Sequence, residues 1–242
     1  MNSLAFPRHR RAGLLAILAT ACVLVIMLIG MLITKPESAA GAGEPAGPHK
    51  RPLVVFIGNS FTGGSAMDTG GIARYPSLLS AKLGFSWMTL TEPGAGYVAR
   101  GTNARTYDDL AAKVPVNADI VVILGSDDDA PYAATDIQTH AAQTYSRIHQ
   151  QAPGAEILVV ATPWGTHPAP AGILTSRDAV RDAALQDGNG FVDPITDKWL
   201  VSGPAGQIGS DGLHPTDVGQ AEMARQLAPA LKTLLEGRSG QQ

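Results

Sequence analysis

Three residues that lie far apart in the sequence have the side chains that serine hydrolysis requires. Ser60 directly follows a short apolar run, and Asp211 and His214 lie three positions apart near the end of the chain. Serine becomes a nucleophile when a histidine takes its proton and a carboxylate fixes the imidazole tautomer. Taken separately, the serine is also typical of a helix cap, and the Asp–His pair of a turn with a surface histidine. Taken together, the three residues favour a catalytic triad.

The order of these residues resembles the GDSL, or SGNH, family of serine hydrolases. In that family a Gly-x-Ser block opens the domain and an Asp-x-x-His block closes it, and here Gly58–Ser60 and Asp211–His214 occupy these places. The resemblance spans residues 53–235. It implies that the serine is the nucleophile, the histidine the base and the aspartate the acid that orients it. It also implies that no cofactor is needed.

Two glycine-containing stretches correspond to the middle blocks of the family. The second block supplies a backbone N–H to the oxyanion, which the resemblance assigns to Gly96, with Gly94 as the alternative register. The third block is Gly-x-Asn-Asp, whose asparagine donates to the oxyanion, and here Asp127 stands at that position. A carboxyl group donates a hydrogen bond only when it is protonated. Loss of one such donor typically costs about 10²–10³ in rate.

The aspartate at position 127 leaves three outcomes open. Asp128 and Asp129 beside it can raise the pKa of Asp127 and keep it protonated. Alternatively, the N–H groups of Ser60 and Gly96 form the oxyanion hole alone. In the third outcome activity is weak or lost. The same three acidic residues lack the spaced ligands of a calcium loop, so we expect no metal site.

Three further residues are candidates for substrate binding. Asn59 precedes the nucleophile where the family usually has aspartate, and it keeps the size and part of the hydrogen bonding of that residue. Trp164 and His167 follow the fourth predicted strand. Trp164 offers an apolar or sugar-stacking wall, and His167 lies either in the cleft or in a surface loop.

Alternating strands and helices must bring these residues together. Apolar runs predict strands at 53–58, 87–90, 119–125, 156–162 and 190–193, and longer amphipathic stretches predict helices at 75–83, 107–113, 134–151, 173–185 and 216–235. This alternation favours a three-layer α/β/α sandwich, flavodoxin-like, with a five-stranded parallel sheet. Active residues of such folds lie beyond the carboxyl ends of the strands, which is where the candidates fall.

The N-terminal region predicts a membrane segment. Residues 13–34 carry no charge and exceed the roughly 20 residues that cross a bilayer, and arginines precede them. A cleaved signal peptide, with a processing site at 40–42 and a secreted product, is the alternative. We expect a cytoplasmic N-terminus at 1–12, a transmembrane anchor or signal segment at 13–34, a flexible stalk at 35–51, an extracytoplasmic hydrolase domain at 52–237 and a tail at 238–242.

Composition narrows the function further. Lys and Arg number 18 against 21 Asp and Glu, which gives no indication of a nucleic-acid partner. We expect a serine esterase or lipase that acts on a small-molecule, lipid or O-acylated envelope glycan ester through an acyl-enzyme. Two alternatives stay open at this point: an acyltransferase of the same fold, and a non-catalytic binding domain with a degenerate oxyanion hole.

Overall fold

The computed structural model describes residues 51–239, which are built around a parallel β-sheet. Its five strands are β1 (Leu53–Gly58), β2 (Ser86–Thr91), β3 (Ile120–Leu124), β4 (Glu156–Val160) and β5 (Gly190–Val192). They lie in the order β2-β1-β3-β4-β5, and every neighbouring pair is parallel. Strands of such a sheet are buried on both faces, which explains the unbroken apolar run IVVIL of β3.

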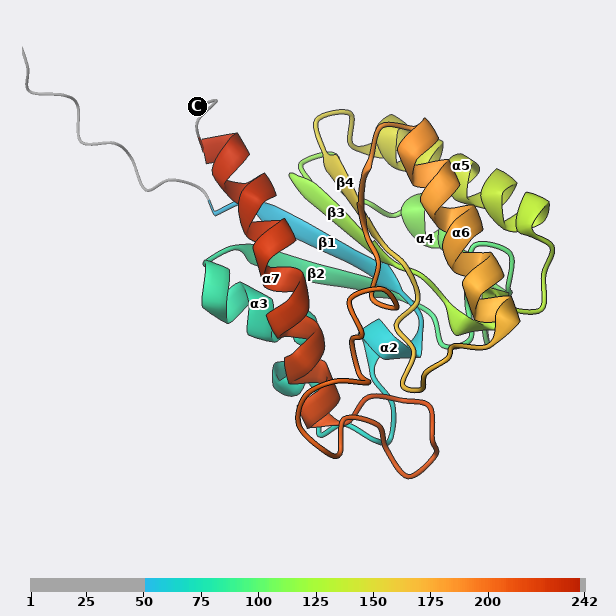
Figure 1. Cartoon of the computed structure of the whole chain (residues 1–242). Helices are drawn as coiled ribbons and strands as arrows, with labels where there is room; N and C mark the ends of the chain where they lie inside the picture. The colour runs from blue at the N-terminus through green and yellow to red at the C-terminus, as the bar shows by residue number, and fades with distance from the viewer. Residues whose placement is uncertain (1–50, 240–242) are drawn as a thin grey trace, which may run out of the picture. The chain divides into compact units, whose positions relative to one another are not determined.

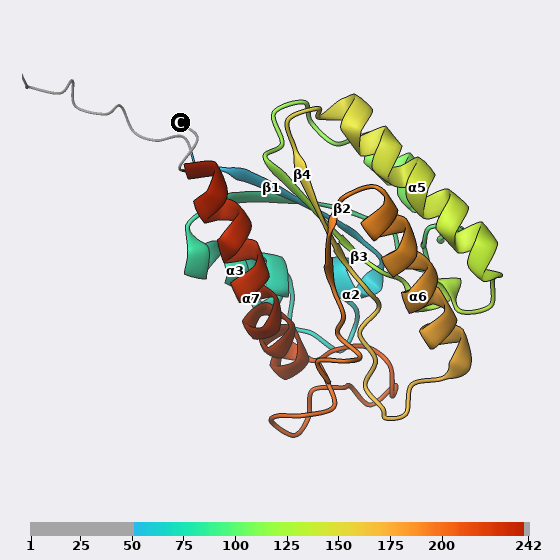
Figure 2. The same cartoon turned by 45° about the horizontal axis from the view of Figure 1, so that its top comes forward.

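Helices cover both faces of the sheet, as Figure 1 shows and Figure 2 confirms in a second view. On one face lie α3 (Tyr75–Leu83) and α7 (Asp217–Ser239), and on the other lie α4 (Tyr107–Ala111), α5 (Ala134–Gln151) and α6 (Ala171–Gln186). Three short elements lie in the loops: α2 (Ser60–Gly63), η1 (Gly71–Ala73) and η2 (Asp127–Asp129).

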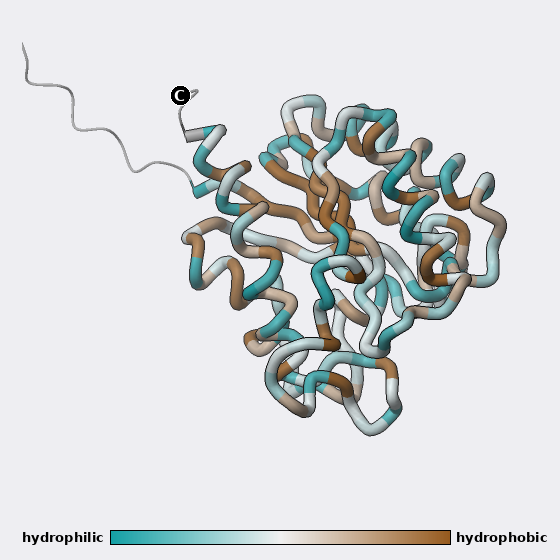
Figure 3. The backbone as a smooth tube through the Cα atoms, viewed as in Figure 1, coloured by the Kyte–Doolittle hydropathy of each residue, from teal (hydrophilic) through white to brown (hydrophobic). Residues whose placement is uncertain are grey.

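The strands supply the centre of two separate hydrophobic cores. Successive residues of a strand point to opposite faces, so Val54 and Phe56 pack with α3 and α7, whereas Val55 and Ile57 pack with α4, α5 and α6. Figure 3 shows the same arrangement as apolar strands between helices that are polar on their outer sides. The phenyl ring of Phe56 meets the ring of Tyr75 edge-on, with centroids 5.6 Å apart.

The predicted three-layer α/β/α fold is confirmed. The helices expected at 75–83 and 134–151 agree to the residue, and α7 continues to Ser239, beyond the predicted end at 235. Two features were not predicted. Ser60 begins the short helix α2, and Asp127 begins the 3₁₀ turn η2.

The predicted cytoplasmic segment and anchor, and all but the last residue of the predicted stalk, lie outside the described residues. Within 51–239, no helix combines the length and the apolar character needed to cross a bilayer.

The order of the strands fixes where a cleft forms. From β1 the chain connects to β2 on one side, and the next strand, β3, lies on the other side of β1. Ligands of open α/β sheets bind outside the carboxyl ends of the strands at such a change of direction. Ser60 follows β1 and Asp127 follows β3, so both lie at this point.

Candidate active site

Ser60 lies on a tight turn between β1 and α2 that Asn59 holds in place. The side-chain Oδ1 of Asn59 accepts the N–H of Phe61 at 3.0 Å, and its backbone carbonyl accepts the N–H of Thr62 at 3.1 Å. Ser60 itself is the first residue of the helix, where the backbone N–H has no acceptor within the helix. Among residues 51–239 no other acceptor bonds this N–H, so it is free to bind a ligand.

A chain of hydrogen bonds joins the three predicted catalytic residues. Ser60 Oγ lies 2.9 Å from His214 Nε2, and His214 Nδ1 lies 2.7 Å from Asp211 Oδ2. Bonds from the backbone N–H of Leu213 and from His214 lower the pKa of Asp211 to about 2. An ionised carboxylate only accepts, so Nδ1 of the imidazole carries a proton. In the neutral imidazole Nε2 therefore accepts from the Ser60 hydroxyl.

The loop at 207–216 holds His214 in this position. The N–H of Gly209 donates to the carbonyl of His214 at 2.8 Å, and Ile208 forms an isolated antiparallel bridge with Pro215. On the other side the ring of Phe61 packs against the imidazole, with centroids 5.7 Å apart. The base is thus held by its own loop and by the helix that carries the nucleophile.

A cleft of about 390 Å³ opens over the nucleophile. Its lining residues are Ser60, Gly64, Ser65, Pro93, Gly94, Thr102, Asp127, Asp128, Leu213 and His214. The structure therefore brings Ser60, His214 and Asp127 together, as the sequence predicts, and Asp211 lies directly behind the imidazole.

Gly96 does not reach this cleft, which corrects the first assignment of the oxyanion hole. Its N–H donates to the carbonyl of Ala99 at 2.9 Å, and its Cα lies against the side chain of Asp129. Gly94, the alternative register, lines the cleft in a left-handed conformation with φ of 75°. Among the described residues nothing accepts the N–H of Gly94.

Asn59 is also placed differently from the prediction. The residue is fully buried, with 0% exposure, so its side chain cannot contact a substrate in the cleft. Its Nδ2 instead donates to Asp127 Oδ1 at 2.9 Å and to Ser126 Oγ at 3.0 Å. Asn59 therefore positions the turn after β3, and no feature of the sequence indicated the contribution of Ser126.

The carboxyl group of Asp127 stands in the cleft beside the nucleophile. Burial and the nearby charge of Asp128 raise the pKa of Asp127, whereas the hydrogen bond from Asn59 and the proximity of His214 act in the opposite direction. The balance favours the protonated form over a wider pH range than for a free aspartate.

The GDSL-like Lipase/Acylhydrolase family model matches residues 56–222 of the chain. The chain belongs to this family. The GDSL lipase Rv0518 of Mycobacterium tuberculosis (strain ATCC 25618 / H37Rv) is 32% identical over 222 residues, which covers 87% of this chain and 95% of the relative. As a member of the family, the protein is a serine hydrolase that acts on ester bonds.

Two solved structures have the same fold. A carbohydrate esterase family 2 enzyme with a carbohydrate binding domain, from Corynascus thermopiles (Myceliophthora fergusii), aligns with a TM-score of 0.62 and 20% identity over 80% of this chain and 69% of that chain. Est24, a carbohydrate acetylesterase from Sinorhizobium meliloti, aligns with a TM-score of 0.61 and 16% identity over 76% of this chain and 100% of that chain. At these identities the likeness establishes the shared architecture.

A second acidic residue of this GDSL-family chain organises the site without entering the cleft. The carboxylate of Asp129 accepts three backbone N–H groups, those of Tyr97, Val98 and Ala99, at 2.7, 3.0 and 2.9 Å. Burial raises the pKa of Asp129, and these three bonds oppose the rise. Because it ties the loop after β2 to the turn after β3, Asp129 places the Gly94 segment beside the nucleophile. Its position directly after the third family block was the only sequence signal.

The predicted substrate-binding residues Trp164 and His167 do not line the cleft of the hydrolase. The indole Nε1 of Trp164 donates to Thr166 Oγ1 at 2.8 Å, and His167 lies exposed in the same loop. The structure thus favours the surface-loop alternative for His167.

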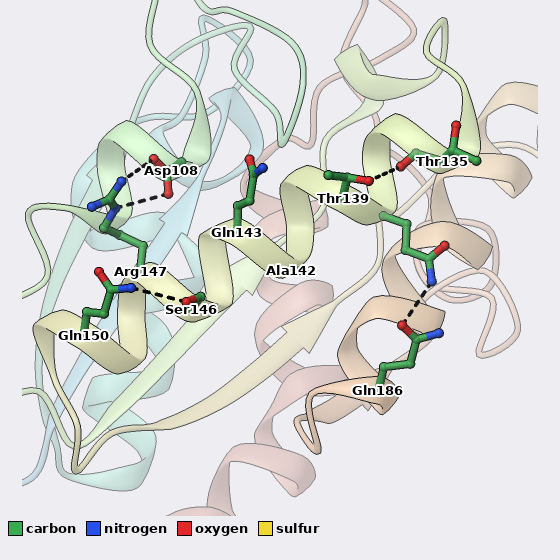
Figure 4. A pocket seen from close by; sticks show the side chains of 10 residues that line it. Asp108, Thr135, Thr139, Ala142, Gln143, Ser146, Arg147, Gln150 and Gln186 are labelled. Atoms are coloured by element: carbon green, nitrogen blue, oxygen red, sulfur yellow. Dashed lines mark hydrogen bonds and ion pairs between the residues drawn. The ribbon is translucent and has the colours of Figure 1, made fainter.

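A larger hollow of about 760 Å³ lies along the outer face of α5, seen from close by in Figure 4. An ion pair between Arg147 and Asp108, 3.2 Å apart, lies at one end, and a bond between Gln138 and Gln186 lies at the other. The lining holds amides and hydroxyls but no serine–histidine pair, so the smaller cleft is the candidate active site. Within 51–239, no group of three or more His, Cys, Asp or Glu side chains is arranged to hold a metal ion.

Proposed function

We propose that the chain hydrolyses acyl esters through an acyl-enzyme formed on Ser60. The observation that carries the proposal is the unbroken hydrogen-bonded chain from Ser60 Oγ through His214 to the ionised Asp211. This is the arrangement that removes a proton from a serine hydroxyl and stabilises the imidazolium that results.

The reaction proceeds in two balanced steps. In the first, Ser60 Oγ attacks the ester carbonyl while His214 Nε2 takes the hydroxyl proton, and the imidazolium then returns that proton to the leaving alcohol. In the second, His214 takes a proton from water, whose oxygen attacks the acyl-enzyme. The carboxylic acid leaves, and Ser60 recovers its proton. Asp211 stays ionised throughout and orients the imidazole.

The backbone N–H groups of Ser60 and Gly94 form the proposed oxyanion hole. Both residues line the cleft, and neither N–H has an acceptor among the described residues. Donors that are fixed before the reaction stabilise the tetrahedral intermediate without reorganisation.

The cleft favours a short acyl group on a polar alcohol over a long-chain lipid. Apolar side chains in its lining are limited to Pro93 and Leu213, whereas Ser65 and Thr102 supply hydroxyl groups. A long acyl chain requires an extended apolar surface, since each buried CH₂ contributes about 0.8 kcal/mol. An O-acylated glycan therefore fits the site better, and two structures that share the fold are carbohydrate esterases by their own descriptions. Parallel assays with the p-nitrophenyl esters of acetate and decanoate test this choice, and faster cleavage of decanoate would reject it.

An extracytoplasmic location is part of the proposal and rests on the apolar segment 13–34 and the arginines before it. Protease added to intact cells should digest the domain of a membrane-retained protein while a cytoplasmic marker survives. N-terminal sequencing of the mature protein separates an uncleaved anchor from processing near 40–42.

The decisive experiment is labelling of the full-length protein in detergent with a fluorophosphonate, followed by mass mapping of the adduct. We expect one adduct, on Ser60, that is absent in Ser60→Ala and strongly slowed in His214→Ala. A folded protein that shows no adduct between about pH 5 and 9 would support the alternative of a binding domain without catalysis.

A further inference from the structure

The carboxyl group of Asp127 lies in the same cleft as Ser60 and His214 and is held in place by hydrogen bonds. Its Oδ1 accepts a hydrogen bond from Asn59 Nδ2 at 2.9 Å, and the backbone N–H of Asp127 also bonds the carboxyl group. Asn59 cannot turn its amide round, because its Oδ1 already accepts the N–H of Phe61. Asp127 lines the cleft together with Ser60 and His214, so its carboxyl group lies beside the space that these two residues share.

The charge of Asp127 decides whether this group helps or opposes the reaction. Attack by Ser60 creates a negative charge on the carbonyl oxygen, and an ionised carboxylate in the same small cleft repels it. A protonated carboxyl group instead donates a hydrogen bond to that oxygen. Because Asn59 Nδ2 donates to Oδ1, the proton of the neutral form belongs on Oδ2, from which it can be donated.

The charged and titratable groups around Asp127 come from three elements. Asp128 follows Asp127 in η2 and also lines the cleft. His214 faces Asp127 from the loop before α7, with Asp211 behind the imidazole. The buried hydroxyl group of Tyr107 in α4 also interacts electrostatically with Asp127. Burial and Asp128 raise the pKa of Asp127, and His214 lowers it. No lysine or arginine side chain lines the cleft to hold the ionised form.

We infer that Asp127 serves as the third donor of the oxyanion hole in its neutral, protonated form, so that ionisation of this one carboxyl group lowers the esterase rate as the pH rises. The inference rests on the proposed function, because it concerns the same acyl-transfer step. The Asp127 proton is donated as a hydrogen bond and is not transferred, so it returns unchanged after each turnover. The active state therefore needs neutral His214 and protonated Asp127 together.

The test compares the pH dependence of kcat/KM for the full-length wild type and Asp127→Asn. The amide has the same shape, accepts from Asn59 through its oxygen and presents an NH₂ donor to the cleft at every pH. The wild-type rate should fall as the pH rises and Asp127 ionises, whereas the variant should reach a plateau. The ratio of variant to wild type should then rise by about tenfold per pH unit, toward a limit of about 10²–10³ set by the loss of one donor. Hydrolysis of p-nitrophenyl acetate, followed where phenol and phenolate absorb equally, gives the rates.

Two further variants test whether the pH dependence of the rate comes from Asp127. Asp128→Asn removes the neighbouring charge that helps to keep Asp127 protonated, so the fall in its rate should begin at a lower pH than in the wild type. Asp182→Asn neutralises an exposed carboxylate on α6, and it should reproduce the wild-type profile. Infrared difference spectra of the phosphonate adduct should show a protonated-carboxyl band that is absent in Asp127→Asn.

Several results would overturn the inference. If the folded Asp127→Asn variant has the wild-type profile, Asp127 does not contact the oxyanion. If it loses activity at every pH while its thermal unfolding is unchanged, the carboxylate acts as an anion. Failure of the proposed function is distinguishable from both, because it appears as hydrolysis that survives Ser60→Ala. Only the rate that depends on Ser60 is used to judge Asp127.

Discussion

The turn at 58–64 that carries Ser60 is largely buried, whereas the loop at 207–216 that carries His214 is partly open to solvent. Exposure is 2% for Phe61 and 1% for Thr62, but 22% and 34% for the side chains of His214 and Asp211. The first is held by groups far away in the sequence, and the second mainly by hydrogen bonds within itself.

Gln220 of α7 accounts for much of this difference. The residue is fully buried, its Oε1 accepts the N–H of Tyr75 and its Nε2 donates to the carbonyl of Phe61, both at 3.0 Å. One side chain thus joins α7, α3 and α2. The nucleophile is positioned by the same contacts that stabilise the fold, whereas the base is positioned by a local loop. Substitutions in the first region should change both stability and rate, and substitutions in the second should change the rate with little effect on stability.

The largest effect should come from His214→Ala. Removing the base from a serine triad lowers kcat by about 10⁴–10⁶. Because the imidazole is partly exposed and its aromatic contact is with Phe61, the thermal midpoint should stay within about 3 °C of the wild type. Steady-state kinetics and thermal unfolding on the same sample measure both quantities. A large fall in the thermal midpoint would show that His214 contributes to the stability of the fold, which would contradict the difference drawn between the loop at 207–216 and the turn at 58–64.

Asp211→Asn should have the next largest effect, about 10⁴ in kcat, again with little change in stability. An amide in place of the carboxylate can donate to Nδ1 of His214, which stabilises the wrong tautomer and leaves Nε2 protonated. Asp211→Glu serves as the control, because it retains the charge. A rate for Asp211→Asn within tenfold of the wild type would show that the loop positions the imidazole without the acid.

The sequence was sufficient to predict the fold and to identify three residues that the structure joins by hydrogen bonds, because both predictions rest on local patterns. Apolar runs such as IVVIL in β3 identify buried strands, and Ser60, Asp211 and His214 stand in short blocks of fixed spacing. The choice between Gly94 and Gly96 could not be made in the same way. It depends on Asp129, which lies 30 to 32 positions away from the loop that it binds.

Residues that act through distant contacts were missed or misplaced for the same reason. Asn59 was expected to touch the substrate, yet it bonds Ser126, 67 positions away, beneath the floor of the cleft. Gln220 bonds a carbonyl 159 positions away and looks in the sequence like any polar residue of an amphipathic helix. Trp164 and His167 lie after the correct strand, but the course of their loop depends on tertiary contacts and leads away from the cleft.

Gln220→Ala should destabilise the protein by about 2–5 kcal/mol, since it leaves a buried N–H and a buried carbonyl without partners. The rate should fall as well, because the carbonyl of Phe61 belongs to the helix that begins with Ser60. Chemical denaturation gives the free energy of unfolding. Gln226→Ala is the matched control on the same helix, where the half-buried side chain makes one bond to Glu222, and it should cost less than about 1 kcal/mol. If the two variants lose the same free energy of unfolding, the two hydrogen bonds of Gln220 do not stabilise the turn at 58–64 in the way proposed.

The smallest effect should appear in the pH dependence of stability. Hydrogen bonds from Leu213 and His214 lower the pKa of Asp211 from 3.8 to about 2 in the folded protein. A carboxyl group with a lowered pKa stabilises the fold above its unfolded value, and this contribution disappears as the pH falls through the folded value. The difference in free energy of unfolding between the wild type and Asp211→Asn should therefore shrink as the pH is lowered from about 5 toward about 2. Because the carboxylate is one-third exposed, solvent screens the effect and keeps it small. The turn at 58–64 has no titratable side chain, so the loop around His214 accounts for this acid sensitivity. If the difference in free energy of unfolding stays constant across this pH range, Asp211 is not held by its loop in solution.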